Sequence, residues 1–130
     1  MPYFTASDLH PGPADPKTFT GTARVARLSA GDGQGSVRVY HVAFDRGARL
    51  HWHRHSGAQW LFVVEGCCRI QQWGEPPRDL VAGDSVCIEP CTRHWHGAAP
   101  GHTGTHIAVN LGATTTWEEG VTEEEYQGKG

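Results

Sequence analysis

Short β-like segments separated by turn signals run along most of the chain, and this spacing is what most limits its fold. Each segment is rich in β-branched or aromatic residues and is bounded by glycine, proline or polar turn residues. We place strands at residues 19–28, 36–44, 49–55, 60–66, 67–73, 79–90 with a turn at 82–84, 93–99 and 104–111. Many short strands in one small chain predict an all-β sandwich or barrel.

Chain length and composition favour a single domain. A chain of 130 residues has room for one core, and its 17 glycines and 8 prolines imply many turns and little long helix. We expect one domain over residues 1–130, with an N-terminal arm at 1–18 and an acidic C-terminal tail at 112–130.

The C-terminal end carries a helical signal. Thr122 precedes three glutamates, and Glu125 stands at the reciprocal position of a capping box. This pattern predicts a short turn of helix that ends at about Tyr126. A solvated acidic tail is the alternative interpretation.

Charge and hydropathy narrow the class of partner. The 11 basic and 14 acidic residues give a net charge of −3, and no stretch is basic enough to follow a phosphate backbone, so we expect no nucleic-acid partner. No apolar run approaches the ~18 residues of a membrane span, and the N-terminus lacks the regions of a signal peptide. The sequence predicts a cytoplasmic protein that acts on a small molecule, with its 4 cysteines as buried free thiols.

The stretch "HWHRH" concentrates histidines at alternate positions. Written as a strand, it places His51, His53 and His55 on one face, which is a metal-binding arrangement. Surface histidines paired with carboxylates are the alternative. The run "WLFVVEG" at 60–66 favours the metal site, because it predicts that the histidines lead into a buried strand that ends in a turn at Gly66.

A second window repeats the alternation some forty residues later. His94 and His96 share a strand face, and in "THIAVNL" the apolar residues alternate with a row that contains His106 and Asn110. Such a polar row suits a pocket wall, although it could also face solvent. Because the strands of so small a domain share one barrel, the two windows together predict metal binding.

These residues carry a resemblance to the cupin family. The first cupin motif is a glycine, five residues, His-x-His, three or four residues, an acidic ligand, six residues and a glycine. Its places are filled by Gly47, His53, His55, Gln59 and Gly66. The chain departs from this motif only at Gln59, where the family has an acid.

The second cupin motif is matched in part. Gly83 and His94 occupy their usual places, whereas Glu89, Cys91 and Ala98 stand where proline, glycine and asparagine are usual. The chain is similar to small manganese-binding bacterial cupins that include the cupin-type hydroxynitrile lyases. This resemblance implies a double-stranded β-helix, or jelly-roll, barrel with a short C-terminal extension, and a homodimer formed through edge strands.

The resemblance also implies roles within the site. The metal ligands that it implies are His53, His55, Gln59 and His94, which leaves His51 at the rim or behind the ligands. The pocket residues that it implies are Tyr40, Val42, His96, His106 and Asn110. On the strand at 36–44, the residues Val37, Val39 and His41 offer a competing inward face.

The glutamine at position 59 bears on the chemistry. Three neutral imidazoles and a neutral amide leave a divalent ion its full charge, which favours a Lewis acid over a redox centre. We expect Mn(II), with Fe(II), Zn(II) and Ni(II) as alternatives, in a lyase of hydroxylated or carbonyl compounds like the hydroxynitrile lyases. His106, with an ordinary pKa near ~6.5, or His96 would transfer the proton. A cupin dioxygenase and a non-catalytic binding or sensing cupin are the alternative functions.

Overall fold

The computed structural model describes residue 3 and residues 5–28, 37–112 and 114–129. The elements in these ranges are the 3-10 helix η1 (Ala6–Asp8), β1 (Gly12–Pro13), β2 (Phe19–Thr20), β3 (Ala23–Arg27), β4 (Val37–Phe44), β5 (Arg49–Leu50), β6 (His53–His55), β7 (Gln59–Gln72), β8 (Arg78–Val81), β9 (Ser85–Ile88), β10 (His94–Ala98), β11 (Gly104–Leu111), β12 (Thr115–Trp117) and α1 (Glu123–Tyr126). The all-β prediction is confirmed.

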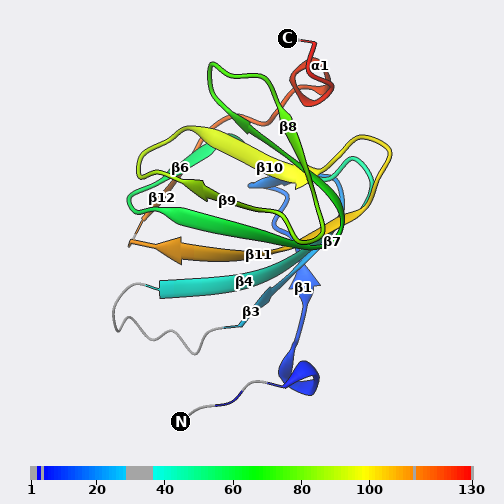
Figure 1. Cartoon of the computed structure of the whole chain (residues 1–130), viewed down its shortest axis with the longest axis vertical. Coiled ribbons are helices and arrows are strands. Elements are labelled where there is room, and N and C mark those ends of the chain that lie inside the picture. The colour runs from blue at the N-terminus through cyan, green and yellow to red at the C-terminus, as the bar shows by residue number, and fades with distance from the viewer. Residues whose placement is uncertain (1–2, 4, 29–36, 113, 130) are drawn as a thin grey trace.

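The strands form one curled antiparallel sheet. Its order is β1-β3-β4-β11-β7-β10-β5-β2, with β8 and β9 paired to β7, and with β6 paired to β10 and β12. The long strand β7 joins the two halves, because residues 59–66 pair with β11 whereas residues 68–72 pair with β10. Figure 1 shows β7 curving across the molecule between these partners. The curl leaves an inner face, on which the site is built.

The junction within β7 differs from the prediction. Residues 60–66 and 67–73 were expected to form two strands with a turn at Gly66, but they are continuous. Gly66 has a φ of +67° inside the strand, and the pairing with β11 shifts register between Thr105 and His106. The predicted turn is wrong because the chain does not reverse here: the left-handed Gly66 stays paired with Gly104, two residues after a β-bulge at Val64.

Only one face of the apolar run in β7 is buried. Leu61 and Val63 are buried, whereas Trp60 is 41% exposed, Phe62 42% and Val64 44%. The prediction of a fully buried strand is therefore wrong for the outer face. The strand covers the core with one side only, as is common in antiparallel sheets.

The histidine-rich segment is broken by a second bulge. Gly97 of β10 pairs with Arg49, whereas His94 pairs with His53, so the β5–β6 side holds one extra residue. The extra residue reverses the alternation, and Leu50 and His53 come to line the same cavity. The prediction that His51 shares a face with His53 is therefore wrong.

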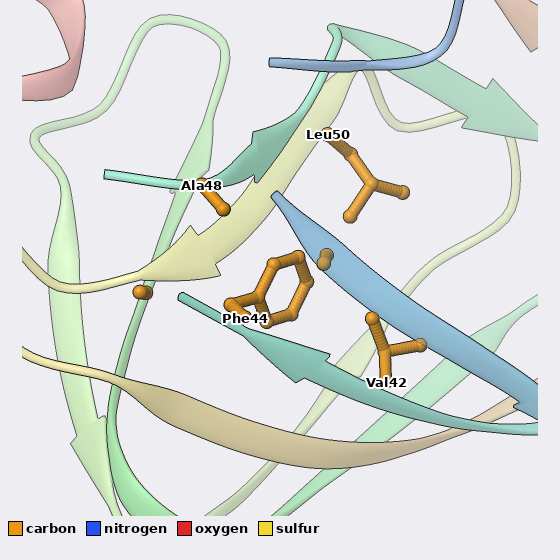
Figure 2. Close-up of a cluster of buried hydrophobic side chains, with 6 residues drawn as sticks. Val42, Phe44, Ala48 and Leu50 are labelled. Carbon is orange, nitrogen blue, oxygen red and sulfur yellow. The ribbon is translucent and has the colours of Figure 1, made fainter. Parts of the chain in front are cut away.

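A compact apolar cluster supports the inner face of the sheet. Figure 2 shows Val42, Phe44, Ala48 and Leu50 pointing toward one another. Phe44 is only 2% exposed, and truncation of such a buried phenylalanine to alanine costs about 3–5 kcal/mol. Because Val42 and Leu50 also line the cavity described below, this cluster holds the cavity wall in place.

The C-terminal segment packs against the sheet. β12 pairs with β6, and the predicted helix is present with both hydrogen bonds of its capping box between Thr122 and Glu125. The buried Tyr126 donates a hydrogen bond from its hydroxyl to the carbonyl of Ala98 at 2.6 Å. The helix interpretation is therefore confirmed over the solvated tail. None of the helices in the described ranges is long and apolar enough to cross a membrane.

The four cysteines are free, but most of them are not buried. Cys68 is buried, and burial raises the pKa of its thiol to about 12. Cys87 and Cys91 are exposed, so the expectation of buried thiols is wrong for them. Cys91 has a φ of +62°, and it stands where the cupin motif usually has glycine. A left-handed backbone is thus kept at this position although the glycine that favours it is missing.

Candidate metal centre

A cavity of about 350 Å³ lies on the inner face of the curled sheet. The candidate residues that line it are Tyr40, Val42, His53, His55, Gln59, His96, His106 and Asn110. His94 is also buried, and its Nε2 lies 3.0 Å from Oε1 of Gln59. The structure therefore brings all the sequence-predicted site residues to one place.

Strand β4 contributes its even-numbered residues to the cavity. Tyr40 and Val42 line it, as expected, so the competing inward face of Val37, Val39 and His41 is wrong. The same alternation places Arg38 in the wall. This residue was not among the predicted site residues, although the period of two points to it. Thr115 and Trp117 of β12 were also missed, because their segment was interpreted as a tail.

Oxygen atoms of the backbone or of a threonine orient three of the histidine rings. Nδ1 of His53 lies 2.8 Å from the carbonyl of His51, and Nδ1 of His94 lies 2.8 Å from the carbonyl of Thr92. Nδ1 of His55 lies 2.9 Å from the hydroxyl of Thr115. A carbonyl only accepts, so His53 and His94 carry their proton on Nδ1 when neutral, and the Nε2 lone pair is left free.

The free nitrogens have too few partners inside the protein. Nε2 of His53 and Nε2 of His55 are buried and have no hydrogen-bond partner among the described residues. Buried polar atoms without a partner are rare in folded proteins and call for an explanation. A cation bound by the Nε2 lone pair of His53, and by that of His55 when its Nδ1 donates to Thr115, supplies this explanation.

Gln59 adds an oxygen to the same space. Its amide nitrogen donates to Oδ1 of Asn110 at 2.7 Å, which turns its Oε1 toward His94. With the proton of His94 on Nδ1, the 3.0 Å contact joins two acceptors, an Nε2 lone pair and a carbonyl oxygen. A cation between or beside them turns this repulsive contact into a favourable one.

His96 lies as close to this centre as the expected ligands. The ring nitrogens of His53, His94 and His96 lie within 4.8 Å of one another. The ring centroid of His55 lies 4.9 Å from that of His53 and 5.6 Å from that of His94. The ring nitrogens of His53, His94 and His96 are thus close together, whereas His55 is placed beside them by the distances between its ring centroid and those of His53 and His94.

His96 and His106 are bonded to each other instead of to fixed oxygens. Nδ1 of His96 lies 2.9 Å from Nε2 of His106, and both side chains are buried. One nitrogen must donate and the other accept, so the proton has two possible positions along this contact. This pair is therefore built differently from the three oxygen-anchored rings.

Burial keeps all five histidines neutral near pH 7. It lowers the pKa of His55, His94 and His106 to about 4, and it also lowers the pKa of His53 and His96. Neutral rings leave lone pairs free for a metal. The expectation of an ordinary pKa for His106 is wrong, because this ring is buried rather than free in a solvated pocket.

The donor set fits a divalent metal ion. Imidazole nitrogens with one amide oxygen suit a mixed nitrogen and oxygen site for Mn, Fe, Ni or Zn. The fit rests on the orphaned Nε2 atoms and on the oxygen-anchored Nδ1 atoms, which are features of metal-binding histidines.

Comparison with known proteins agrees with this geometry. The Cupin domain family model matches residues 40–110, which contain all the candidate site residues. An (R)-mandelonitrile lyase from Granulicella tundricola is 40% identical over 119 residues, which are 89% of each chain.

Solved structures share the fold. A cupin-like protein from Thermotoga maritima matches with a TM-score of 0.86 and 40% identity, over 88% of this chain and 90% of that one. An RmlC-like cupin from Shewanella frigidimarina matches with a TM-score of 0.68 and 22% identity, over 85% of this chain and 90% of that one. At that lower identity the likeness concerns the fold alone.

Proposed function

The chain belongs to the cupin family, and from that premise we propose that it is a metal-dependent lyase of small hydroxylated or carbonyl compounds, with cleavage of a cyanohydrin as the sharpest example. One observation carries the proposal. Oxygen-anchored imidazoles direct unpartnered Nε2 atoms to one buried centre beside a cavity large enough for a small substrate. The relative named as a mandelonitrile lyase supports the reaction class.

The proposed ligands of the ion are His53, His55, Gln59 and His94. Carbonyl oxygens set the tautomers of His53 and His94, and the hydroxyl of Thr115 supports that of His55. These oxygens do not titrate near neutral pH, so the Nε2 lone pairs stay available to the ion. The proposed ion is Mn(II), which the resemblance to manganese-binding cupins implies, and the amide oxygen of Gln59 is a donor type that suits it. When bound, the ion supplies a Lewis acid that polarises a substrate oxygen and lowers the pKa of a bound hydroxyl group.

The His96–His106 pair moves the proton. In cyanohydrin cleavage the hydroxyl proton leaves, the bond between the carbinol carbon and the nitrile breaks, and cyanide departs with the electron pair and then takes up a proton. Nε2 of His96 accepts the hydroxyl proton when Nδ1 of His96 donates to His106. The low pKa of both rings means that the proton is readily passed on to cyanide.

Metal analysis joined to an anaerobic assay tests this proposal. We expect about one divalent ion per chain and release of benzaldehyde from mandelonitrile at the same rate with and without oxygen. Strict dependence on oxygen would replace the lyase with a dioxygenase. Tight binding of small ligands without turnover of any cyanohydrin would instead indicate a binding or sensing module.

A further inference from the structure

We propose that the cavity selects a substrate that carries a carboxylate, and that Arg38 binds this group. The inference rests on the proposed function in so far as the substrate occupies this cavity. It adds the class of compound, a small acid with a hydroxyl or carbonyl group and an apolar body.

The first support is the position of Arg38. It pairs with Asn110 across β4 and β11 and lies on the same inward face as Tyr40 and Val42. One guanidinium nitrogen, Nη2, donates to the carbonyl of Gly112 at 3.3 Å. Nε is buried and has no hydrogen-bond partner among the described residues. A guanidinium carries five N–H donors in a planar fork, so Arg38 has donors left for a ligand.

The second support is the charge of the cavity wall. Arg38 is the one formally charged side chain among the described residues that line the cavity, and none of them is a carboxylate. The neutral histidines, Gln59 and Asn110 do not offset it. Although the whole chain has a net charge of −3, its cavity is therefore positive even before an ion binds.

The charge of Arg38 reaches the histidine cluster. Arg38 lines the same cavity as His53, His55 and Gln59, which are three of the proposed ligands. An anion held by Arg38 would thus lie within electrostatic reach of the proposed metal ligands.

The rest of the wall suits the body of such a substrate. Phe19, Val25, Leu50 and Trp117 add apolar side chains to the cavity wall. A carboxylate accepts two parallel hydrogen bonds from arginine, which a nitrile or an amide cannot match with the same charge. Mandelate, which has a carboxylate where mandelonitrile has its nitrile, is therefore a suitable probe, and mandelamide is its neutral counterpart.

Isothermal titration calorimetry with these two probes tests the inference. The protein is titrated both metal-loaded and metal-free, because mandelate can also chelate an ion, and the metal-free form isolates the contribution of Arg38. We expect the wild type to bind mandelate more tightly than mandelamide. Arg38→Gln should weaken mandelate binding by about 10- to 100-fold and change mandelamide binding by less than about twofold.

Two further variants make the result specific. Arg38→Lys keeps the charge but not the fork, so it should retain part of the preference for mandelate. Arg24→Gln removes the same charge from an exposed position on β3 and should change neither affinity. Metal content and thermal unfolding show whether each variant is folded.

The inference is overturned if wild-type protein does not prefer mandelate, or if Arg38→Gln weakens both probes equally. The second result would give Arg38 a structural role through Gly112. Either result can occur while metal content and cyanohydrin turnover uphold the proposed function. Absence of metal binding in the wild type would sink the proposed function instead.

Discussion

The five buried histidines form two groups that are built on different principles. His53, His55 and His94 have their Nδ1 atoms beside oxygens of the backbone or of a threonine. Within the part of the chain that the structure describes, the side-chain hydrogen bond of His96 and His106 is the one between them, at 2.9 Å. All five are similarly buried and neutral, so burial and pKa do not separate them.

The partner of Nδ1 decides what each ring can do. A ring held by a carbonyl keeps one tautomer and offers the same lone pair permanently, which suits a metal ligand. A ring held by another imidazole can exchange tautomers by moving one proton, which suits acid–base catalysis. This difference supports the proposed ligation by the first group and the proposed proton transfer by the second. For His55 the hydroxyl of Thr115 fits the ligating tautomer without fixing it, because a hydroxyl can donate or accept.

The largest expected effect comes from removing two members of the oxygen-anchored group. His53→Ala combined with His55→Ala should reduce the metal content from about one ion per chain to none after dialysis against a chelator, because two of four ligands are lost. His96→Ala is the matched control and should keep its ion. Loss of metal from the control, with retention by His55→Ala, would move His96 into the ligand set.

The next effect comes from breaking the imidazole pair. His106→Ala removes the partner of Nδ1 of His96 and should lower mandelonitrile turnover by about 10²-fold, with metal content unchanged. The pH–rate profile should shift as well, since the pKa of His96 includes a contribution from His106. Full activity in this variant would make His106 a packing residue only.

Acid should destabilise the metal-free protein through both groups. Burial lowers the pKa of His55, His94 and His106 to about 4, whereas an unfolded histidine titrates near ~6.5. The unfolded chain therefore binds more protons between these values, and stability present above pH ~6.5 is lost as the pH falls toward 4. Melting temperatures at pH 7.5 and pH 5 measure this loss. Equal values in the metal-free protein would contradict the buried, neutral rings.

The smallest effect is expected at His51. Its backbone carbonyl holds Nδ1 of His53, but its side chain does not line the cavity. His51→Ala keeps the carbonyl, so metal affinity and turnover should stay within about twofold of the wild type. A tenfold loss of metal affinity would show that the imidazole itself takes part.

The alternation of side chains along each strand predicted which face most of the site residues occupy. It did not predict where a bulge interrupts that alternation. The period of two placed His53, His55, His106 and Asn110 correctly on inward faces. It failed at His51 because the bulge between Arg49 and His53 depends on pairing with β10, which lies more than forty residues away. Distant pairing of this kind leaves no mark in a short window of sequence.

Hydrophobicity alone predicted the existence of β7 but not which of its faces is covered. Leu61 and Trp60 are both apolar, yet one is buried and the other is 41% exposed. Whether a second layer covers the outer face is a property of the whole fold. Trp117 was missed for a related reason, because β12 gains its place by pairing with β6.

The hydrogen bonds around the centre join parts of the chain that are far apart in sequence. His94 meets Gln59 across 35 residues, Gln59 meets Asn110 across 51, and His55 meets Thr115 across 60. Each of these contacts closes a large loop, and the entropy of that closure opposes formation of the centre. An ion bound by the native state alone would offset this cost by mass action, so the stability of the fold would depend on the supply of metal.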